Sequence, residues 1–275
     1  MQHQLLTITH HIARITLHHP PANVLNLSVL KELEQVLSEV EADEYVRVVV
    51  VTGTGRFFCA GADMHELAHL MTVHGGSEFA VRGQSLFSRI ERSEKPVIAA
   101  INGTCVGGGL ELALACHIRV AAIGVMLGLP EIKLGLIPGF GGTQRLPRVV
   151  GASNAAEMIL TGESLSAEAA LRIGLVSRVV PPHELMPETE SIAALIAVRG
   201  KTAVEAALYA IRGGLDIPLS EGLAREAELF GRLCITPDKQ EAVQAFLEKR
   251  QPRLAETDVR DTSGLRQAHL DKLET

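Results

Sequence analysis

The sequence contains no tryptophan, and Phe and Tyr together bring its aromatic content to only 3% of 275 residues. A core with so few large rings must be built from Leu, Ile, Val and Ala. Proteins that stack bases or sugars on aromatic side chains need several such rings on one surface. The composition therefore disfavours carbohydrate binding and binding of single-stranded nucleic acid.

Basic residues are also too few for a nucleic-acid surface. Lys and Arg total 26 against 32 Asp and Glu, which gives a formal net charge of −6. Such a balance offers little attraction to a polyanion. Hydrophobic residues make up 47% and charged residues 21%. Because this is an ordinary globular mixture, a disordered or collagen-like chain is excluded.

Long apolar runs and paired cysteines are missing as well. The four cysteines are Cys59, Cys105, Cys116 and Cys234. They show no Cys-x-x-Cys spacing, which argues against a redox pair, a zinc knuckle or a disulfide framework and fits a reducing compartment. The apolar stretch 97–129 is interrupted before about 18 clean residues accumulate, and the N-terminus lacks the pattern of a secretory signal. We expect a soluble, cytoplasmic protein that does not bind membranes.

Strand and helix patterns alternate over the first part of the chain. Residues 4–18 alternate as a two-stranded hairpin would, 27–40 carry apolar residues at helical spacing, and 46–52 is a β-branched run typical of a buried strand. A second set consists of a helix over 77–92, a strand over 96–102, a helix from the glycine turn 107–109 to about 116 and a strand over 118–123. This order predicts an α/β protein, in which functional groups commonly lie on turns between a strand and the next helix.

From about residue 151 the pattern becomes mainly helical. A short helix over 153–161 should end at Gly162, and 176–180 is the last predicted strand. Further helices are predicted over 185–198, 203–211, 219–233 and from Thr236-Pro237 onwards. We divide the chain into a catalytic core over 1–199, a helical domain over 200–254 and a charged tail over 255–275.

Two turns of small residues follow predicted strands. Phe58-Cys59-Ala60-Gly61-Ala62-Asp63 lies between a strand and a helix, and Gly107-Gly108-Gly109-Leu110-Glu111 begins a helix. Small residues let the backbone approach a ligand, and the free N–H groups at a helix start favour developing negative charge. Either turn alone is ordinary, but the two together suggest a paired oxyanion hole.

Two glutamates stand beside these turns. Glu111 lies in an apolar helix, where burial makes a carboxylate costly unless it is paired or used. Glu131 follows Pro130 at a predicted helix start, where carboxylates are common dipole partners. A structural ion pair or a helix-dipole role explains either residue taken alone. The following stretch 135–146 is so rich in Gly and Pro that we predict an irregular loop.

Four segments in combination resemble the signatures of the enoyl-CoA hydratase (crotonase) family. They are Cys59-Ala60-Gly61-Ala62-Asp63, Gly107-Gly108-Gly109-Leu110-Glu111, Leu129-Pro130-Glu131 and Ile137-Pro138-Gly139-Phe140-Gly141-Gly142-Thr143-Gln144-Arg145-Leu146. Later landmarks extend the similarity over residues 5–254. The resemblance implies a spiral of ββα units followed by a helical C-terminal domain that assembles trimers, commonly paired into hexamers.

The same resemblance implies a reaction, namely syn addition of water across the C2–C3 double bond of a trans-2-enoyl-CoA to give a 3-hydroxyacyl-CoA. Glu111 would activate the water and Glu131 would protonate C2. The backbone N–H groups of Ala62 and Gly108 would form the oxyanion hole. No metal or redox cofactor is expected, because coenzyme A is part of the substrate.

Contacts to coenzyme A are also implied by the resemblance. Within the core they fall on Ala60, Gly61, Ala62, Asp63, Met64 and Gly107. Phe230 and Lys249 match C-terminal positions that help to hold CoA from a neighbouring subunit, which implies a homotrimer or a dimer of trimers. His117 departs from the family, where Asp is common at this position. Acyl chain length and the choice between trimer and hexamer stay open.

Other functions within the same fold are less well supported by the residues. An enoyl-CoA isomerase needs only one carboxylate, and other CoA-thioester lyases or hydrolases of the family are a further alternative, but both Glu111 and Glu131 are present. A non-catalytic scaffold would not need either of them. An RNA-binding relative uses a lysine-rich helix, whereas the charged residues over 31–44 here are all acidic except Lys31.

One motif indicates a different chemistry. His65-Glu66-Leu67-Ala68-His69 fits the H-E-x-x-H pattern of zinc proteases, and Glu91 or Glu94 could nominally supply a third ligand. A pattern this short also occurs by chance, and this one directly follows the turn 59–63. We therefore interpret it as a chance match and expect no metal site.

Overall fold

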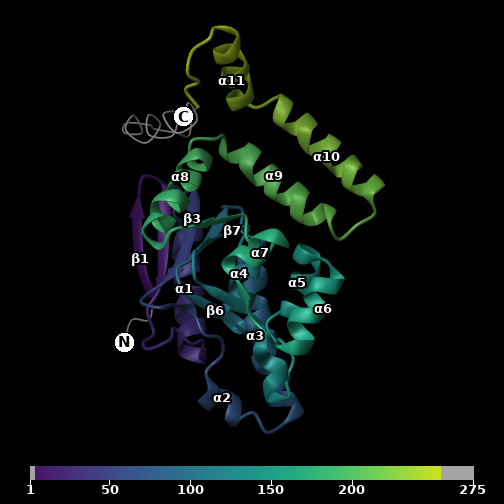
Figure 1. Ribbon diagram of the computed structural model, residues 1–275. Coiled ribbons are helices and arrows are strands. Elements are labelled where there is room, and N and C mark those ends of the chain that lie inside the picture. The colour runs from purple at the N-terminus through teal and green to yellow at the C-terminus, as the bar shows by residue number, and fades with distance from the viewer. Residues whose placement is uncertain (1–3, 255–275) are drawn as a thin grey trace.

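The larger of two β-sheets has six strands. The computed structural model describes residues 4–254 (Figure 1). This sheet has the order β1-β2-β3-β5-β7-β10, and only the β1–β2 pair is antiparallel. Its strands are β1 (Gln4–Thr9), β2 (Ile12–Leu17), β3 (Val48–Gly53), β5 (Val97–Ile101), β7 (Ile118–Ala122) and β10 (Arg178–Val180). The predicted hairpin and the predicted strands are thereby confirmed. Val48 to Val51 are buried because both faces of a parallel sheet are covered.

A second, smaller sheet lies beside the first, in the order β4-β6-β8-β9. Its strands are β4 (Phe57–Cys59), β6 (Thr104–Val106), β8 (Met126–Gly128) and β9 (Leu165–Ser166). The first three follow β3, β5 and β7 directly in the chain, and each is followed by a helix. The chain therefore repeats a unit of one strand in the large sheet, one strand in the small sheet and a helix, which is the expected ββα spiral.

Helices cover the sheets and complete the core. They are α1 (Leu27–Ala42), α2 (Met64–Ala68), α3 (Val73–Glu91), α4 (Gly108–Ala115), the 3₁₀ helix η1 (Pro130–Leu134), α5 (Gly142–Val150), α6 (Ala152–Thr161), α7 (Ala167–Arg172), the 3₁₀ helix η2 (Pro182–Glu184) and α8 (Leu185–Ala197). Helix α1 is capped by Asn26, whose side chain accepts a hydrogen bond from the Val29 N–H. Every residue of α4 is buried, so this helix is the centre of the core.

Helix α5 corrects one prediction. The stretch 135–146 was expected to be an irregular loop throughout, but a helix begins at Gly142 and runs to Val150. The chain enters it through Gly141, whose φ of +113° lies in the left-handed region that glycine favours. The helix tolerates Pro147 in its interior because Leu146 and Val150 are buried against the core. Tertiary packing thus outweighs the local cost of glycine and proline.

The C-terminal region is helical, as predicted. It consists of α9 (Lys201–Gly214), α10 (Leu219–Cys234) and α11 (Pro237–Leu247), which extend from the core as an arm (Figure 1). Neither α9 nor α10 contains a buried residue. The predicted tail 255–275 lies outside the described residues. Over residues 4–254, no helix has the length and apolar character needed to cross a membrane.

Candidate active site

The two glycine turns meet in space. Strands β4 and β6 are parallel neighbours, so the turns that follow them leave the small sheet at the same edge. A Cβ built on Gly61 would lie 3.1 Å from the carbonyl oxygen of Val106 and 3.2 Å from the nitrogen of Gly108. Only the absence of a side chain at Gly61, which has φ +95°, allows this approach.

This approach leaves two backbone donors side by side. The N–H of Leu25 donates to Gly61 at 2.8 Å and the N–H of Asp63 donates to Leu25 at 3.0 Å, so the intervening Ala62 N–H faces away from Leu25. Gly108 is the first residue of α4 and has no acceptor in its own helix. A Cβ on Gly108 would lie 3.5 Å from the Ala62 nitrogen. Among the described residues, neither N–H group has a hydrogen-bond acceptor.

Glu111 lies one turn further along α4, with only 2% of its surface exposed. Its Oε1 accepts hydrogen bonds from the N–H groups of Phe140 at 2.8 Å and Gly142 at 2.7 Å. Burial raises the pKa of the Glu111 carboxyl from 4.5 to about 7, and repulsion from Glu131 adds to this. The two N–H donors and the charge of Arg145 act in the opposite direction on this pKa. Glu111 is therefore poised to gain or lose a proton near neutral pH.

Glu131 is the second carboxylate of the site and lies on η1. Its Oε2 is buried and, within residues 4–254, has no hydrogen-bond partner. Burial raises the pKa of this carboxyl too. A buried polar atom without a partner in a folded protein calls for an explanation. The structure thus brings together two carboxylates of raised pKa and two unbonded N–H donors, all of them predicted site residues.

The other predicted contacts of the core lie on the same turns. Asp63 caps α2, accepting hydrogen bonds from the N–H groups of His65 at 2.7 Å and Glu66 at 3.3 Å. The N–H of Ala60 is bound to the carbonyl of Ala22 at 3.0 Å. Met64 is 54% exposed. Gly61 packs against Gly108, and Gly107 packs against Oε1 of Glu131. Ala60, Asp63 and Met64 flank Gly61 and Ala62 in the chain, and Asp63 already has a structural role.

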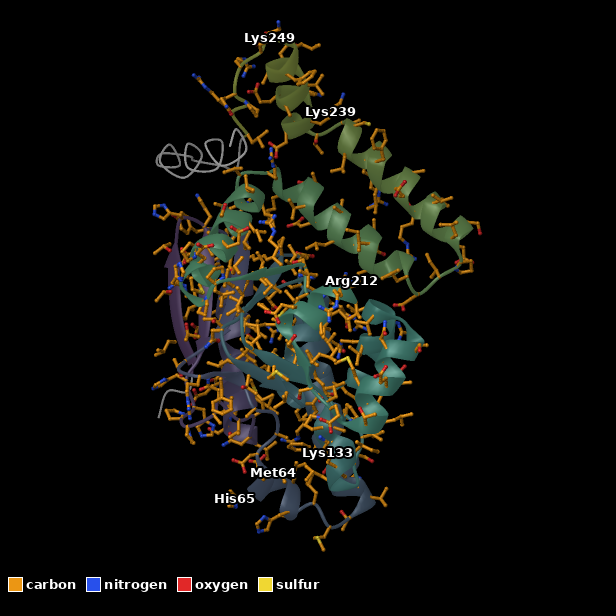
Figure 2. The ribbon with its side chains drawn as sticks, in the orientation of Figure 1. Met64, His65, Lys133, Arg212, Lys239 and Lys249 are labelled. Atoms are coloured by element: carbon orange, nitrogen blue, oxygen red, sulfur yellow. The ribbon has the colours of Figure 1, made fainter. Side chains whose placement is uncertain are left out.

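Phe230 and Lys249 are not brought to this site within one chain. Phe230 is 69% exposed on α10, and Lys249 follows the end of α11. Lys249 and Met64 lie at opposite ends of the molecule (Figure 2). Within a single chain, the structure therefore does not bring these two predicted residues to the carboxylate site.

The His65–His69 motif forms the short helix α2 and its end. Glu66 accepts hydrogen bonds from the Leu27 N–H at 3.1 Å, and the Nδ1 of His69 donates to the carbonyl of His65 at 2.6 Å. Both histidines are exposed, and His65 lies at the edge of the molecule (Figure 2). No cluster of three or more His, Cys, Asp or Glu suited to a metal ion occurs in the described part of the chain.

His117, which replaces the family's common Asp, joins β5 to α3. Its Nδ1 accepts from the Val97 N–H at 2.9 Å, and its Nε2 donates to the carbonyl of Glu91 at 3.2 Å. Burial lowers the pKa of this imidazole from 6.5 to about 4. His117 is therefore neutral at physiological pH and serves as a structural link.

Three residues of the site were not singled out from the sequence. Phe140 and Gly142 supply the N–H groups that hold Glu111, and Arg145 binds the carbonyl of Phe140 at 2.9 Å. One sequence signal could have revealed the N–H donors: Gly141 and Gly142 precede a short helical periodicity of apolar residues, and the start of a helix presents free N–H groups. The many glycines and prolines of this stretch instead predicted an irregular loop.

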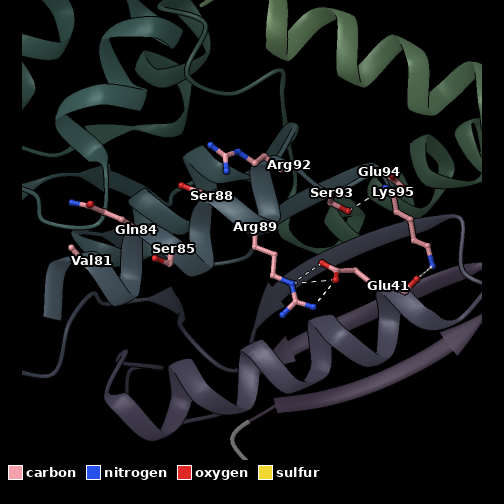
Figure 3. A pocket seen from close by; sticks show the side chains of 10 residues that line it. All are labelled: Glu41, Val81, Gln84, Ser85, Ser88, Arg89, Arg92, Ser93, Glu94 and Lys95. Carbon is pink, nitrogen blue, oxygen red and sulfur yellow. Dashed lines mark hydrogen bonds and ion pairs between the residues drawn. The ribbon is translucent and has the colours of Figure 1, made fainter. Parts of the chain in front are cut away.

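A cavity of about 710 Å³ lies between α1 and α3, and none of the predicted catalytic or CoA-binding residues lines it (Figure 3). The Nε of Arg89 donates to the Glu41 carboxylate at 3.0 and 3.1 Å. The Nζ of Lys95 donates to the carbonyls of Val40 and Asp43, both at 2.6 Å, at the end of α1. Arg89 thus ties α3 to α1, and Lys95, which lies between α3 and β5, binds the end of α1.

Known proteins are similar to this chain in both sequence and fold. The enoyl-CoA hydratase/isomerase family model matches residues 7–257. A probable enoyl-CoA hydratase of Bacillus subtilis (strain 168) is 44% identical over 249 residues, which is 90% of this chain and 96% of that protein. A short-chain-enoyl-CoA hydratase of Clostridium acetobutylicum is 44% identical over 87% of this chain and 92% of its own length. The crystal structure of an enoyl-CoA hydratase from Bacillus anthracis superposes with a TM-score of 0.89 at 41% identity, covering 93% of this chain and all of that one. The chain therefore belongs to the enoyl-CoA hydratase/isomerase (crotonase) family, as its motifs predicted.

Proposed function

We propose that this protein hydrates the C2–C3 double bond of a trans-2-enoyl-CoA to give a 3-hydroxyacyl-CoA. The observation that carries the proposal is a pair of carboxylates, buried Glu111 and half-buried Glu131, beside the unbonded N–H groups of Ala62 and Gly108. The similar proteins from Bacillus subtilis and Clostridium acetobutylicum bear hydratase names, which supports the same reaction here.

The two backbone donors would bind the thioester oxygen. Attack of water at C3 moves electron density through C2 to this oxygen, where negative charge develops. Donors already fixed in place stabilise that charge without reorganisation, and each is typically worth about 3 to 4 kcal/mol. The rigid turns that carry Ala62 and Gly108 meet this requirement.

The two carboxylates would divide the proton transfers. Ionised Glu111 takes a proton from water as its oxygen bonds to C3, and protonated Glu131 delivers a proton to C2. Burial favours the protonated form of Glu131, and its unpartnered Oε2 is free to face a substrate. Each transfer typically contributes about 10² to 10⁴ in rate. The acid–base chemistry uses only these side chains and the substrate, so we propose no metal or redox cofactor.

Hydration is favoured over double-bond isomerisation by the same pair. Moving a double bond between C3 and C2 requires one carboxylate to carry a proton between C4 and C2. Adding water requires a further group that orients and deprotonates the water. Glu111 and Glu131 lie close enough for the charge of Glu131 to raise the pKa of Glu111.

The assembly would complete the CoA site. We propose a homotrimer or a dimer of trimers, in which Phe230 and Lys249 approach CoA bound mainly to a neighbouring copy along Ala60–Met64 and Gly107. The arm of α9, α10 and α11 supports this, because large apolar side chains remain exposed on it. They include Ile211, Leu215, Leu219, Leu223, Phe230, Ile235, Phe246 and Leu247. Apolar surface of this extent on one element typically marks a protein interface.

The decisive test is hydration of C4 to C16 enoyl-CoA thioesters, followed by loss of the conjugated enoyl absorbance. We expect hydration by the parental protein and a fall in kcat of at least about 10² for Glu111→Gln, with KM little changed. Glu131→Gln should lower kcat by the same factor and should also slow exchange of the C2 proton with solvent. Glu94→Gln, at an exposed position outside the site, is the matched control. Hydration of crotonyl-CoA by Glu111→Gln at nearly the parental rate would refute the two-carboxylate mechanism.

A further inference from the structure

Arg145 is a charged residue that the structure has buried, with only 9% of its surface exposed. Its Nε and Nη2 bind the Glu91 carboxylate of α3 at 3.1 and 2.9 Å. The same Nη2 donates to the Ser88 hydroxyl at 3.1 Å, and Nη1 donates to the carbonyl of Phe140 at 2.9 Å. All three nitrogens of the guanidinium donate hydrogen bonds, and these contacts hold the planar group in one position.

Both the carbonyl and the N–H group of Phe140 are hydrogen-bonded to side chains. Its carbonyl accepts from Arg145, and its N–H donates to Oε1 of Glu111 at 2.8 Å. At Gly141 a Cβ would lie only 2.2 Å from Nη1 of Arg145. The guanidinium therefore packs directly against the segment 140–142, whose N–H groups hold the Glu111 carboxylate.

The anchor of Arg145 is itself fixed. Glu91 stands at the end of α3, where its backbone carbonyl accepts hydrogen bonds from His117 at 3.2 Å and from Arg212 of α9 at 3.0 Å. His117, which immediately precedes β7, Arg212 of α9 and Arg145 of α5 thus all bind Glu91 of α3. Movement of Arg145 would require this whole junction to shift.

The geometry points to Arg145 as a positioning residue for Glu111. Through the carbonyl of Phe140, it fixes the segment 140–142 and thereby the two N–H groups that orient the carboxylate, while Glu91 holds Arg145 in place. This inference rests on the proposed function, since it assigns Arg145 a part in the same hydration. Arg145 contacts neither the carboxylate nor the unbonded donors, so it acts only through Phe140 and through its charge.

The charge of Arg145 acts on the pKa of Glu111, and a residue with a purely structural role would not change this pKa. The charged groups that act on Glu111 are Glu131 from η1 and Arg145 from α5, with Glu91 from α3 balancing Arg145. The neighbouring strands β4 and β6 contribute only the buried thiols of Cys59 and Cys105, whose pKa values burial raises. Removing the positive charge should raise the pKa of Glu111, and removing the negative charge of Glu91 should lower it.

The test compares crotonyl-CoA hydration by Arg145→Gln, Arg145→Lys and Glu91→Gln. Arg145→Gln should lower kcat by about 10-fold to 10²-fold with KM little changed, because a small displacement of a catalytic group costs this much. The acid limb of its kcat/KM profile should move to higher pH, and that of Glu91→Gln should move to lower pH. Arg145→Lys keeps the positive charge but loses the planar set of donors that binds Glu91 and Phe140 together. The acid limb of its kcat/KM profile should therefore stay near the parental position while kcat falls.

Arg148→Gln is the matched control, since Arg148 lies on the same helix and its pair with Asp216, at 3.7 Å, is exposed. It should leave kcat and the pH profile unchanged. Folding of each variant is checked by thermal unfolding, and if Arg145→Gln does not fold, the other two variants decide. Parental kcat and pH limbs in the folded variants of Arg145 and Glu91 would overturn the inference. A parental protein that hydrates no enoyl-CoA would instead refute the proposed function.

Discussion

Oε1 of Glu131 lies 2.9 Å from the point that a Cβ on Gly107 would occupy. Gly107 has φ +55° and immediately precedes α4. The second carboxylate is therefore seated against the turn that begins the helix of Glu111, and the missing side chain at Gly107 makes the space for it.

Gly107→Ala should separate this contact from backbone strain. A methyl group there would displace the Glu131 carboxylate, so hydration should fall by at least about 10-fold, in line with a misplaced acid. Gly124→Ala introduces similar strain at φ +84° with nothing within 4 Å, and each variant should lose about 1 to 3 kcal/mol of stability. Chemical unfolding and hydration assays measure both effects. Equal hydration rates in the two variants would show that Glu131 is not seated against Gly107.

The stability of the protein should depend on the ionisation of Glu111. Its pKa is raised from 4.5 to about 7 in the folded protein, so the folded state keeps a proton that the unfolded state releases. Stability from this group is present below about pH 4.5 and is lost as pH rises to about 7. Relative to Glu111→Gln, the parental protein should lose at most about 3 kcal/mol over this range. Urea unfolding at pH 5 and pH 8 measures the difference, and a difference that does not change with pH would contradict the raised pKa.

Lys249→Ala tests whether a neighbouring copy contributes to CoA binding. Loss of one contact to a phosphate should raise KM for enoyl-CoA several-fold and leave kcat nearly intact, because the lysine is remote from the carboxylates. Lys239→Ala, on α11 of the same arm, is the control. Light scattering at micromolar concentration should give a mass built from trimers. A monomer that still shows the Lys249 effect would exclude the shared site.

Chelation tests the His65–His69 motif. Protein treated with a chelator should retain full hydration activity, because Glu66 and His69 are engaged in hydrogen bonds of the α2 segment. His69→Ala should leave the fold intact and alter at most the binding of the acyl chain. Stoichiometric zinc together with loss of activity on chelation would overturn the interpretation of this segment as a chance match.

Residue patterns were sufficient for the large sheet and for most helices. Val48 to Val51 form a continuous β-branched run because both sheet faces are covered, and α1 shows its buried face at helical spacing. The strands β4, β6, β8 and β9 were not predicted, because segments of two or three residues carry no measurable period. Helix α5 was missed because burial of Leu146 and Val150 outweighs the local preferences of glycine and proline.

The sequence by itself determined the two small-residue turns, the glutamates that follow them and, through their combination, the family. Each motif is local, so spacing along the chain is enough to recognise it. The tertiary structure decided what surrounds those groups: the approach of Gly61 to Gly108, the N–H groups of Phe140 and Gly142 on Glu111, and the anchoring of Arg145 by Glu91. These contacts join residues about 30 to 50 positions or more apart. The pKa of a buried carboxyl depends on its burial and on distances to such partners, which exist only after the chain has folded.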